Sequence, residues 1–119
     1  VKEAAGAGSV SVTLGGDHSM ALGSLSGLAQ ARAAHGKIGL LWIDAHPDIH
    51  TWETSRRKTF NAIQMTALTG QVPDSLKNLL GPQAVLSPAH IFYVGLRSID
   101  EPEIHALSRL GIRCYTNGD

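Results

Sequence analysis

The sequence predicts an α/β protein in which helices cover both faces of a parallel sheet. One observation is alternation: strand-like apolar runs are separated by segments whose apolar residues recur every three or four positions. Another is the run Ile38–Ile43, whose nearly unbroken apolar character is typical of a strand buried on both sides of a parallel sheet. The length of 119 residues suits one compact domain with a modest core.

Four segments are predicted to be strands of this sheet. Ser9–Leu14 alternates and is rich in β-branched residues, and the apolar run Ile38–Ile43 follows it along the chain. Ile91–Leu96 and Ile112–Tyr115 have a similar β-branched and aromatic character. Because helices connect successive strands, we expect the strands to run parallel.

Helices are predicted in the intervals between these strands. Gly15-Gly16 breaks the first strand, and Asp17 is a suitable N-cap for an amphipathic helix that Gly36 ends. A polar loop over 51–59 leads into a second helix, which Gly70 ends. The predicted helical segments are His18–His35, 60–70, 74–80 and Glu101–Leu110.

Composition excludes several classes of protein. Lysine and arginine together number 10 and balance the 10 acidic residues, so no net charge points to nucleic acid or an anionic membrane as a partner. No apolar stretch is long enough to span a bilayer, and no signal sequence is visible. The single cysteine, Cys114, has no internal partner, which fits a reducing compartment and a cytoplasmic protein. Because the chain begins at Val1 rather than Met, we expect residues 1–119 to be one partial domain of a longer chain.

The most informative motif is Asp-Ala-His-Pro-Asp at 44–48, directly after the run that ends at Ile43. Side chains two residues apart on an extended backbone point to the same side, so Asp44, His46 and Asp48 are expected to converge if that geometry continues. Two carboxylates and an imidazole suit a divalent ion such as manganese, and the thiolates of a structural zinc site are missing. The alternative is a solvated loop after the strand.

Three polar segments follow predicted strands: Gly-Gly-Asp-His at 15–18, the motif at 44–48, and Arg-Ser-Ile-Asp at 97–100. Ligands of parallel α/β sheets bind beyond the carboxyl ends of the strands, so we expect these segments to meet at one site. The first segment could instead be only a turn with a helix cap, and Asp100 could cap the helix that begins near Glu101.

Together these segments resemble the motifs of the arginase (ureohydrolase) family. The matching runs are Gly-Gly-Asp-His-Ser at 15–19, Asp-Ala-His-Pro-Asp at 44–48 and Val-Gly-Leu-Arg-Ser-Ile-Asp at 94–100, in the family's order and spacing. Asp-Ile-His-Thr at 48–51 and Arg-Ser-Ile-Asp-Glu-Pro-Glu at 97–103 resemble arginase more closely than agmatinase. The resemblance implies a three-layer αβα fold with a central parallel sheet, incomplete over these residues.

The resemblance also implies a site for two manganese ions. His18 and Asp48 would bind one ion, His46 would bind the other, and Asp44 would bridge them. Two divalent ions at close range repel each other, which a bridging carboxylate offsets. Water activated by the metals would attack the guanidinium carbon of L-arginine and yield ornithine and urea, with Asp48 holding the nucleophile.

Substrate contacts are implied in the same way. Asp100 matches an acidic residue that helps to bind the substrate's α-amino group, and Ser55 lies in a loop that holds the α-carboxylate. His50 stands where arginases usually have Asn, and Arg57 where they have Ser; both side chains could still contact a carboxylate, Arg57 through two hydrogen bonds. The expected partner is a small guanidino molecule, and the family commonly forms homotrimers or hexamers.

Two features depart from the family. Its Asn-X-His-Gly-X-Pro signature matches the run Thr59–Gln64 and puts Asn61 where a proton-shuttling His is expected, although Asn does not titrate near neutral pH. The Asp-X-Asp segment and the further Glu that complete the family's metal site lie beyond residue 119. We therefore expect weak or single-metal binding from this chain alone.

Three alternatives stay open at this point. The altered carboxylate loop is compatible with another guanidino or formimino substrate, such as agmatine. Asn61 is compatible with a catalytically inactive homologue that serves as a binding or regulatory module. His50 is either a polar loop residue or a replacement for the missing proton shuttle.

Overall fold

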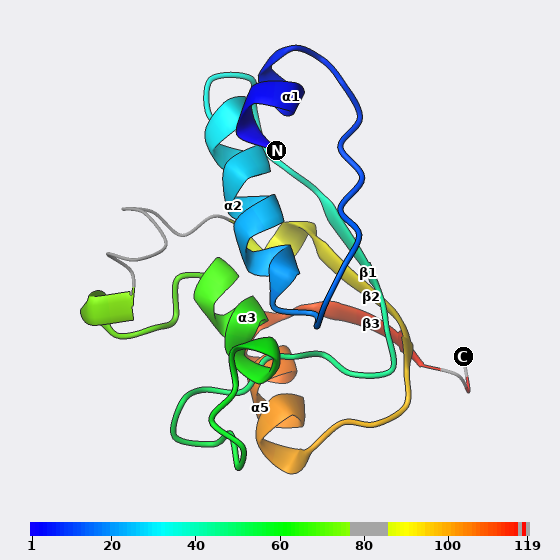
Figure 1. Ribbon diagram of the computed structural model, residues 1–119. Coiled ribbons are helices and arrows are strands. Elements are labelled where there is room, and N and C mark those ends of the chain that lie inside the picture. The colour runs from blue at the N-terminus through cyan, green and yellow to red at the C-terminus, as the bar shows by residue number, and fades with distance from the viewer. Residues whose placement is uncertain (77–85, 117, 119) are drawn as a thin grey trace.

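The computed structural model of the chain describes residues 1–76, 86–116 and 118, and Figure 1 shows how its elements are arranged. Helices and strands alternate along most of the chain, as the sequence predicts. In chain order the elements are α1 (Lys2–Gly6), α2 (Met20–Arg32), β1 (Leu40–Ile43), α3 (Phe60–Leu68), the 3₁₀ turn η1 (Pro88–His90), β2 (Ile91–Leu96), α5 (Glu101–Leu110) and β3 (Arg113–Thr116).

The strands form one parallel sheet in the order β1-β2-β3. Ile43 of β1 is opposite Val94 of β2, and Val94 is opposite Tyr115 of β3. The register between β2 and β3 shifts between Val94 and Leu96, where Gly95 has a φ of 85° that a residue with a side chain rarely adopts. The predicted parallel sheet is confirmed for three of its four expected strands.

The strand predicted at Ser9–Leu14 is wrong for this structure. The segment is not a strand, and its apolar side chains are among the most exposed of the chain, with Val10 at 90%, Val12 at 76% and Leu14 at 88%. An alternating pattern specifies a strand only where a neighbouring strand pairs with its backbone and a layer buries its apolar face. Over the described residues neither is present at this segment.

The predicted helix boundaries agree best where the chain carries a cap at both ends. Over Glu101–Leu110 the helix α5 has the predicted bounds: Glu103 Oε2 accepts a hydrogen bond from the Asp100 N–H at 3.1 Å, and Gly111 ends the helix with a φ of 63°. The first main helix, α2, is shorter than the predicted His18–His35 at both ends. Its N-cap is Ser19, so the prediction of Asp17 as N-cap is wrong; the Asp17 carboxylate instead accepts a hydrogen bond from the Ser19 N–H at 3.0 Å before the helix begins. Of the turn predicted over 74–80, residues 74–76 are helical and the rest lies outside the described residues.

None of the described helices has the length and apolar character that crossing a bilayer would take.

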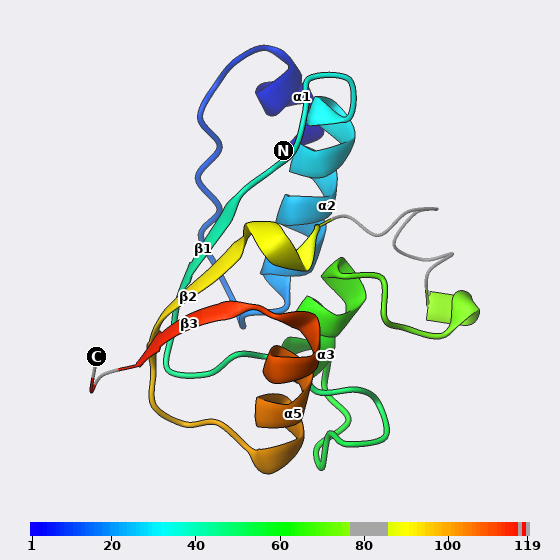
Figure 2. The ribbon, with the colours of Figure 1, turned by 180° about the vertical axis from the view of Figure 1, so that it is seen from behind.

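The core lies on one face of the sheet. Trp42, Ile91 and Tyr93 are buried there, and α2, α3 and α5 all lie on that side in Figure 2. On the opposite face, Leu41 is 61% exposed and Ile43 is 73% exposed. Val94 and Tyr115 on the same face are also exposed. The described residues therefore supply the sheet and one helical layer of the incomplete αβα arrangement.

The loop after β1 is fastened to the carboxyl edge of the sheet. Tyr93 Oη donates a buried hydrogen bond of 2.6 Å to the Pro47 carbonyl oxygen, and Ile49 packs into the core at 2% exposure. The N–H groups of Arg97 and Ser98 both donate to the Ala45 carbonyl oxygen at 3.0 Å. These contacts determine where the polar residues of the loop lie.

Removing the Tyr93 hydroxyl tests this anchor. Burial raises the pKa of Tyr93 well above its usual value, so the hydroxyl stays protonated and can donate at neutral pH. Tyr93→Phe leaves the buried Pro47 carbonyl without its donor and should lower the free energy of unfolding by about 1–3 kcal/mol, measured by urea denaturation. Tyr115→Phe, at an exposed position, is the matched control and should change it little. Equal effects of the two substitutions would contradict the anchoring role.

Candidate metal centre

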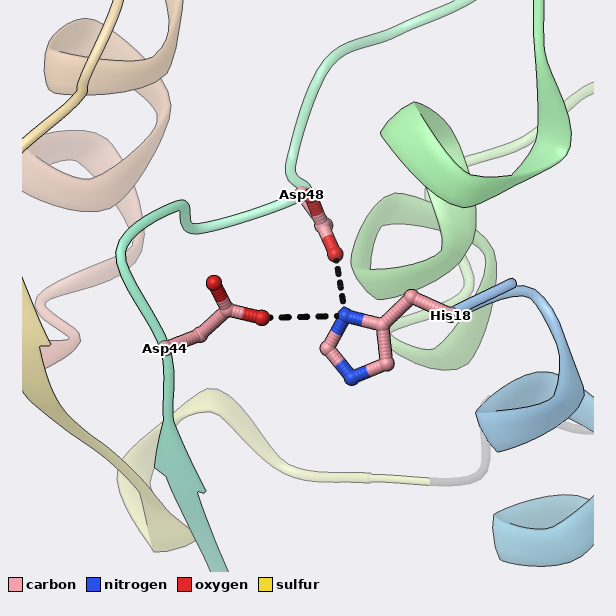
Figure 3. Close-up of side chains that lie close together, drawn as sticks. All are labelled: His18, Asp44 and Asp48. Atoms are coloured by element: carbon pink, nitrogen blue, oxygen red, sulfur yellow. Dashed lines mark ion pairs between the residues drawn. The ribbon is translucent and has the colours of Figure 1, made fainter. Parts of the chain in front are cut away.

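Three side chains from two separate segments meet beyond the end of β1. His18, just before α2, places Nδ1 2.9 Å from Asp48 Oδ2 and 3.0 Å from Asp44 Oδ2 (Figure 3). The ligand atoms of the three residues lie within 4.8 Å of one another, and each residue is partly buried. This cluster could hold a divalent cation through two carboxylate oxygens and an imidazole nitrogen.

His46 does not join that cluster, so the expectation of one common point for Asp44, His46 and Asp48 is wrong. The backbone leaves the extended conformation directly after β1: Asp44 Oδ1 accepts a hydrogen bond from the His46 N–H at 3.0 Å, and Asp48 has a φ of 51°. The His46 ring, 59% exposed, instead approaches the other oxygen of Asp44, with Nδ1 3.5 Å from Oδ1. The two oxygens of Asp44 thus face two different imidazoles.

A buried tryptophan supports the His18 ring. The rings of His18 and Trp42 are stacked, with centroids 4.3 Å apart and planes inclined by 27°. Trp42 is 5% exposed and meets Tyr93 edge-on at 6.4 Å. Trp42 lies in β1, two residues before Asp44, and was not identified from the sequence.

Asp48 is held in an unusual conformation. Its φ of 51° lies in the left-handed region, where Asp is tolerated better than most residues with a side chain. Its carboxylate accepts hydrogen bonds from His18 and from Gln64, a residue that the sequence analysis missed because nothing in its helical pattern marks it. Burial raises the pKa of Asp48, and the hydrogen bond from Gln64 opposes that rise.

A second cluster joins the loop after β1 to the start of α5. His50 Nε2 lies 3.3 Å from Asp100 Oδ2 and 3.7 Å from Glu103 Oε1. Glu103, 5% exposed, also accepts a hydrogen bond from the Ile49 N–H at 3.3 Å. Asp100 occupies the N-cap position of α5, as the capping hypothesis predicted, and still presents its carboxylate to His50. Glu103 was not identified from the sequence; its place three residues after a helix-capping Asp is the pattern that could have revealed it.

Asp48 of the first cluster and all three residues of the second cluster line a shared cavity of about 380 Å³. Ser55 lies in its wall but is 2% exposed, and its hydroxyl accepts a hydrogen bond from the Lys58 N–H at 3.2 Å. Asn61 lies in the same wall, so the residue at the expected shuttle position does face the site. The lining residues are His46, Asp48, His50, Ser55, Arg56, Arg57, Thr59, Asn61, Ala62, Ser98, Asp100 and Glu103.

Fold and site together define an α/β protein with acidic and histidine side chains gathered beyond the carboxyl edge of a parallel sheet, where such folds bind their ligands. The chain belongs to the arginase family, whose family model matches residues 1–119.

Individual relatives agree with this assignment. The arginase of Coccidioides immitis is 36% identical over 124 residues, a match that covers all of this chain and 38% of that protein. The solved structure of arginase from Bacillus caldovelox superposes with a TM-score of 0.87 at 33% identity, covering 97% of this chain and 38% of that one. An Entamoeba histolytica arginase in complex with L-ornithine matches with a TM-score of 0.82 at 30% identity, over 99% of this chain and 41% of that one. The chain thus spans roughly two fifths of the length of these relatives.

A formimidoylglutamase from Bacillus subtilis shares the fold with a TM-score of 0.70, over 97% of this chain and 33% of that one. Its identity of 17% supports a common fold and nothing finer.

Replacing the Asp48 carboxylate should not lower the Tm of the metal-free protein at neutral pH. Because burial raises its pKa in the folded state, ionised Asp48 costs stability at neutral pH, and this cost disappears as the pH falls through the raised pKa. Metal-free Asp48→Asn should therefore have an equal or higher Tm than the unchanged protein at pH 7, with the difference shrinking in acid. Asn also tolerates the left-handed backbone.

Asp17→Asn is the matched control for this prediction. Hydrogen bonds from Ser19 lower the pKa of Asp17, so removing its charge should not raise the Tm at pH 7. A lower Tm for metal-free Asp48→Asn than for Asp17→Asn at pH 7, measured by differential scanning fluorimetry, would refute the account.

Proposed function

We propose that the protein carrying this chain is a manganese-dependent hydrolase that converts L-arginine to ornithine and urea. One observation carries the proposal: in a chain of the arginase family, Asp44 Oδ2 and Asp48 Oδ2 both approach His18 Nδ1, while His46 approaches the other oxygen of Asp44. A carboxylate whose two oxygens face two separate nitrogen ligands has the arrangement that a bridge between two ions requires.

The donor set fits manganese. In this proposal His18 and Asp48 would hold one ion, His46 would hold the second, and Asp44 would contact both. Carboxylate oxygens and imidazole nitrogens suit such an ion, and no thiolate competes for it in the described cluster. When bound, the metal supplies a water acidified enough to act as a nucleophile at neutral pH. The ligands still missing from a two-metal site would come from parts of the full-length protein outside this chain.

Asp48 is the residue to which we assign a catalytic role. Its carboxylate borders both the metal cluster and the shared cavity, so it can accept a hydrogen bond from the attacking water and orient it toward the guanidinium carbon. Gln64 Nε2 and His18 Nδ1 both lie 2.9 Å from Asp48 Oδ2, which limits the freedom of the carboxylate to rotate.

The cavity also suits an α-amino acid as substrate. Asp100 presents a carboxylate that is 65% exposed and can bind an ammonium group. Arg57 and His50 line the same cavity. Arg57 has no acidic partner among the described residues and can bind a carboxylate, whereas His50 can do so only by turning Nε2 away from Asp100. Ser55 contributes through the loop it stabilises, because its hydroxyl already accepts the Lys58 N–H.

The remaining properties that we propose rest on membership of the family. They are two manganese ions per site, a small guanidino molecule as the partner rather than nucleic acid or a membrane, assembly into a homotrimer or hexamer, and a cytoplasmic location.

A second candidate is favoured by one observation. Asn61 lines the cavity at the position where a titrating His is expected, so the chain lacks that proton carrier. A catalytically inactive arginase-like module would retain the fold and the metal cluster without turnover. A hydrolase of another guanidino or formimino substrate would retain turnover. Its altered loop at His50 and Arg57 would select a substrate that differs from arginine at the end remote from the guanidinium group.

Urea release from L-arginine tests the first candidate. The full-length natural protein should release urea only after loading with manganese, and Asp44→Asn should abolish that turnover because it removes the proposed bridge. Glu3→Gln changes a carboxylate of α1 outside the site and serves as the control. Manganese binding without turnover of L-arginine, agmatine or formimino substrates would support the inactive module instead.

Proton transfer can be tested separately in an active preparation. Both ring nitrogens of His50 already have partners, since Nδ1 lies 3.1 Å from Thr54 Oγ1 and Nε2 faces Asp100. We therefore expect His50→Asn to change kcat little. Asn61→His, which restores a titrating group in the cavity wall, should raise kcat by up to about 100-fold, with Asn61→Gln as its control. A kcat that falls in His50→Asn and stays constant in Asn61→His would assign the proton transfer to His50.

A further inference from the structure

We propose that Gln64 is a positioning residue that orients the carboxylate of Asp48 for metal binding. Gln64 lies in α3, is fully buried at 0% exposure, and donates a hydrogen bond from Nε2 to Asp48 Oδ2 at 2.9 Å. The inference rests on the metal site of the proposed function and adds to it a residue that touches neither metal nor substrate.

The orientation of the Gln64 amide follows from its neighbours. Nε2 lies 2.9 Å from a carboxylate oxygen of Asp48 and 3.3 Å from the Asn61 carbonyl oxygen, and both of these atoms can only accept. The amide nitrogen must therefore face them and donate both of its hydrogens. A glutamate of the same size could not take this place without its own proton, and an apolar side chain could not donate at all.

The other end of the amide shows that packing alone does not explain Gln64. Its Oε1 is buried and has no hydrogen-bond partner among the described residues. An unpaired buried acceptor costs stability, so a leucine or methionine of similar volume would fill the space at a lower cost. What glutamine provides and those residues lack is the pair of N–H donors directed at Asp48 and Asn61.

The next residue of α3 holds the backbone of Asp48. The Met65 N–H donates to the Asp48 carbonyl oxygen at 3.0 Å, while Asp48 itself has the left-handed φ of 51°. Consecutive residues of one helix thus bind the main chain and the side chain of the same aspartate. The helix determines both the path of the backbone at Asp48 and the direction of its carboxylate.

The carboxylate oxygen that Gln64 holds is the one that faces the cluster. Asp48 Oδ2 lies 2.9 Å from His18 Nδ1, on the side where Asp44 also approaches (Figure 3). A hydrogen bond to a ligating carboxylate limits its rotation, and loss of such a bond typically weakens metal binding by about 10- to 100-fold. Gln64 also stands where the family signature has Pro, which cannot donate any of these bonds.

Metal affinity measured without turnover tests this role. In the full-length natural protein, Gln64→Met removes both donors at nearly constant volume and should raise the Kd for manganese by about 10- to 100-fold by isothermal titration calorimetry. The Tm of the metal-free protein should fall only modestly, because losing the donors to Asp48 and the Asn61 carbonyl costs stability while removing the unpaired Oε1 regains part of it. Gln71→Met is the matched control: the Gln71 side chain bonds Thr69 and Arg109, away from the cluster, and its loss should leave the Kd unchanged.

Each result decides the matter. Gln64→Leu repeats the measurement with a branched side chain, in case the methionine variant fails to fold. Manganese affinity in either folded variant within twofold of the unchanged protein would refute the positioning role. If the unchanged protein binds no manganese, the proposed function fails together with this inference; if it binds and the variants bind equally well, only this inference fails.

Discussion

The candidate site depends on one buried hydrogen bond, from Tyr93 Oη to the Pro47 carbonyl oxygen. It ties the loop after β1 to the neighbouring strand β2 at 2.6 Å, within the core and out of contact with water. Asp44, His46 and Asp48 all lie within three residues of Pro47, so their positions follow from that attachment. A loop free to move would let the two carboxylates separate, because their like charges repel each other.

The same repulsion explains why the cluster suits a cation. Asp44 and Asp48 approach one imidazole nitrogen of His18 from two sides, and burial, with a further contribution from the charge of Asp44, raises the pKa of Asp48. Trp42 stacks on the His18 ring, and Gln64 donates a hydrogen bond to Asp48. Both side chains hold the cluster in place and carry no charge that would neutralise the carboxylates. The fold thus keeps negative charge at a partly buried point, which a divalent ion would stabilise.

The elements predicted correctly from the sequence are those whose ends carry their own local interactions. The helix α5 is capped at Asp100 by a reciprocal cap and ends before a left-handed Gly111, and β2 begins with an unbroken β-branched and aromatic run over Ile91–Val94. Ser9–Leu14 has an equally clear alternating pattern but forms no strand, because pairing and burial must come from other segments. The extended geometry expected through Asp48 failed for a related reason, since side-chain and tertiary hydrogen bonds turn the chain after β1.

The sequence by itself determined the parallel α/β class, the family motifs, and the set of carboxylates and histidines at the strand ends, since these depend on residue type and spacing. Only the tertiary structure decided which atoms meet: His18 with Asp44 and Asp48, His46 with the second oxygen of Asp44, and His50 with Asp100. It alone revealed Gln64, whose helical position looks ordinary in the sequence, and the contact of Glu103 with Ile49, which the capping pattern does not specify. Their importance comes from contacts across 16 and 54 residues of chain, and no local pattern encodes a contact over that separation.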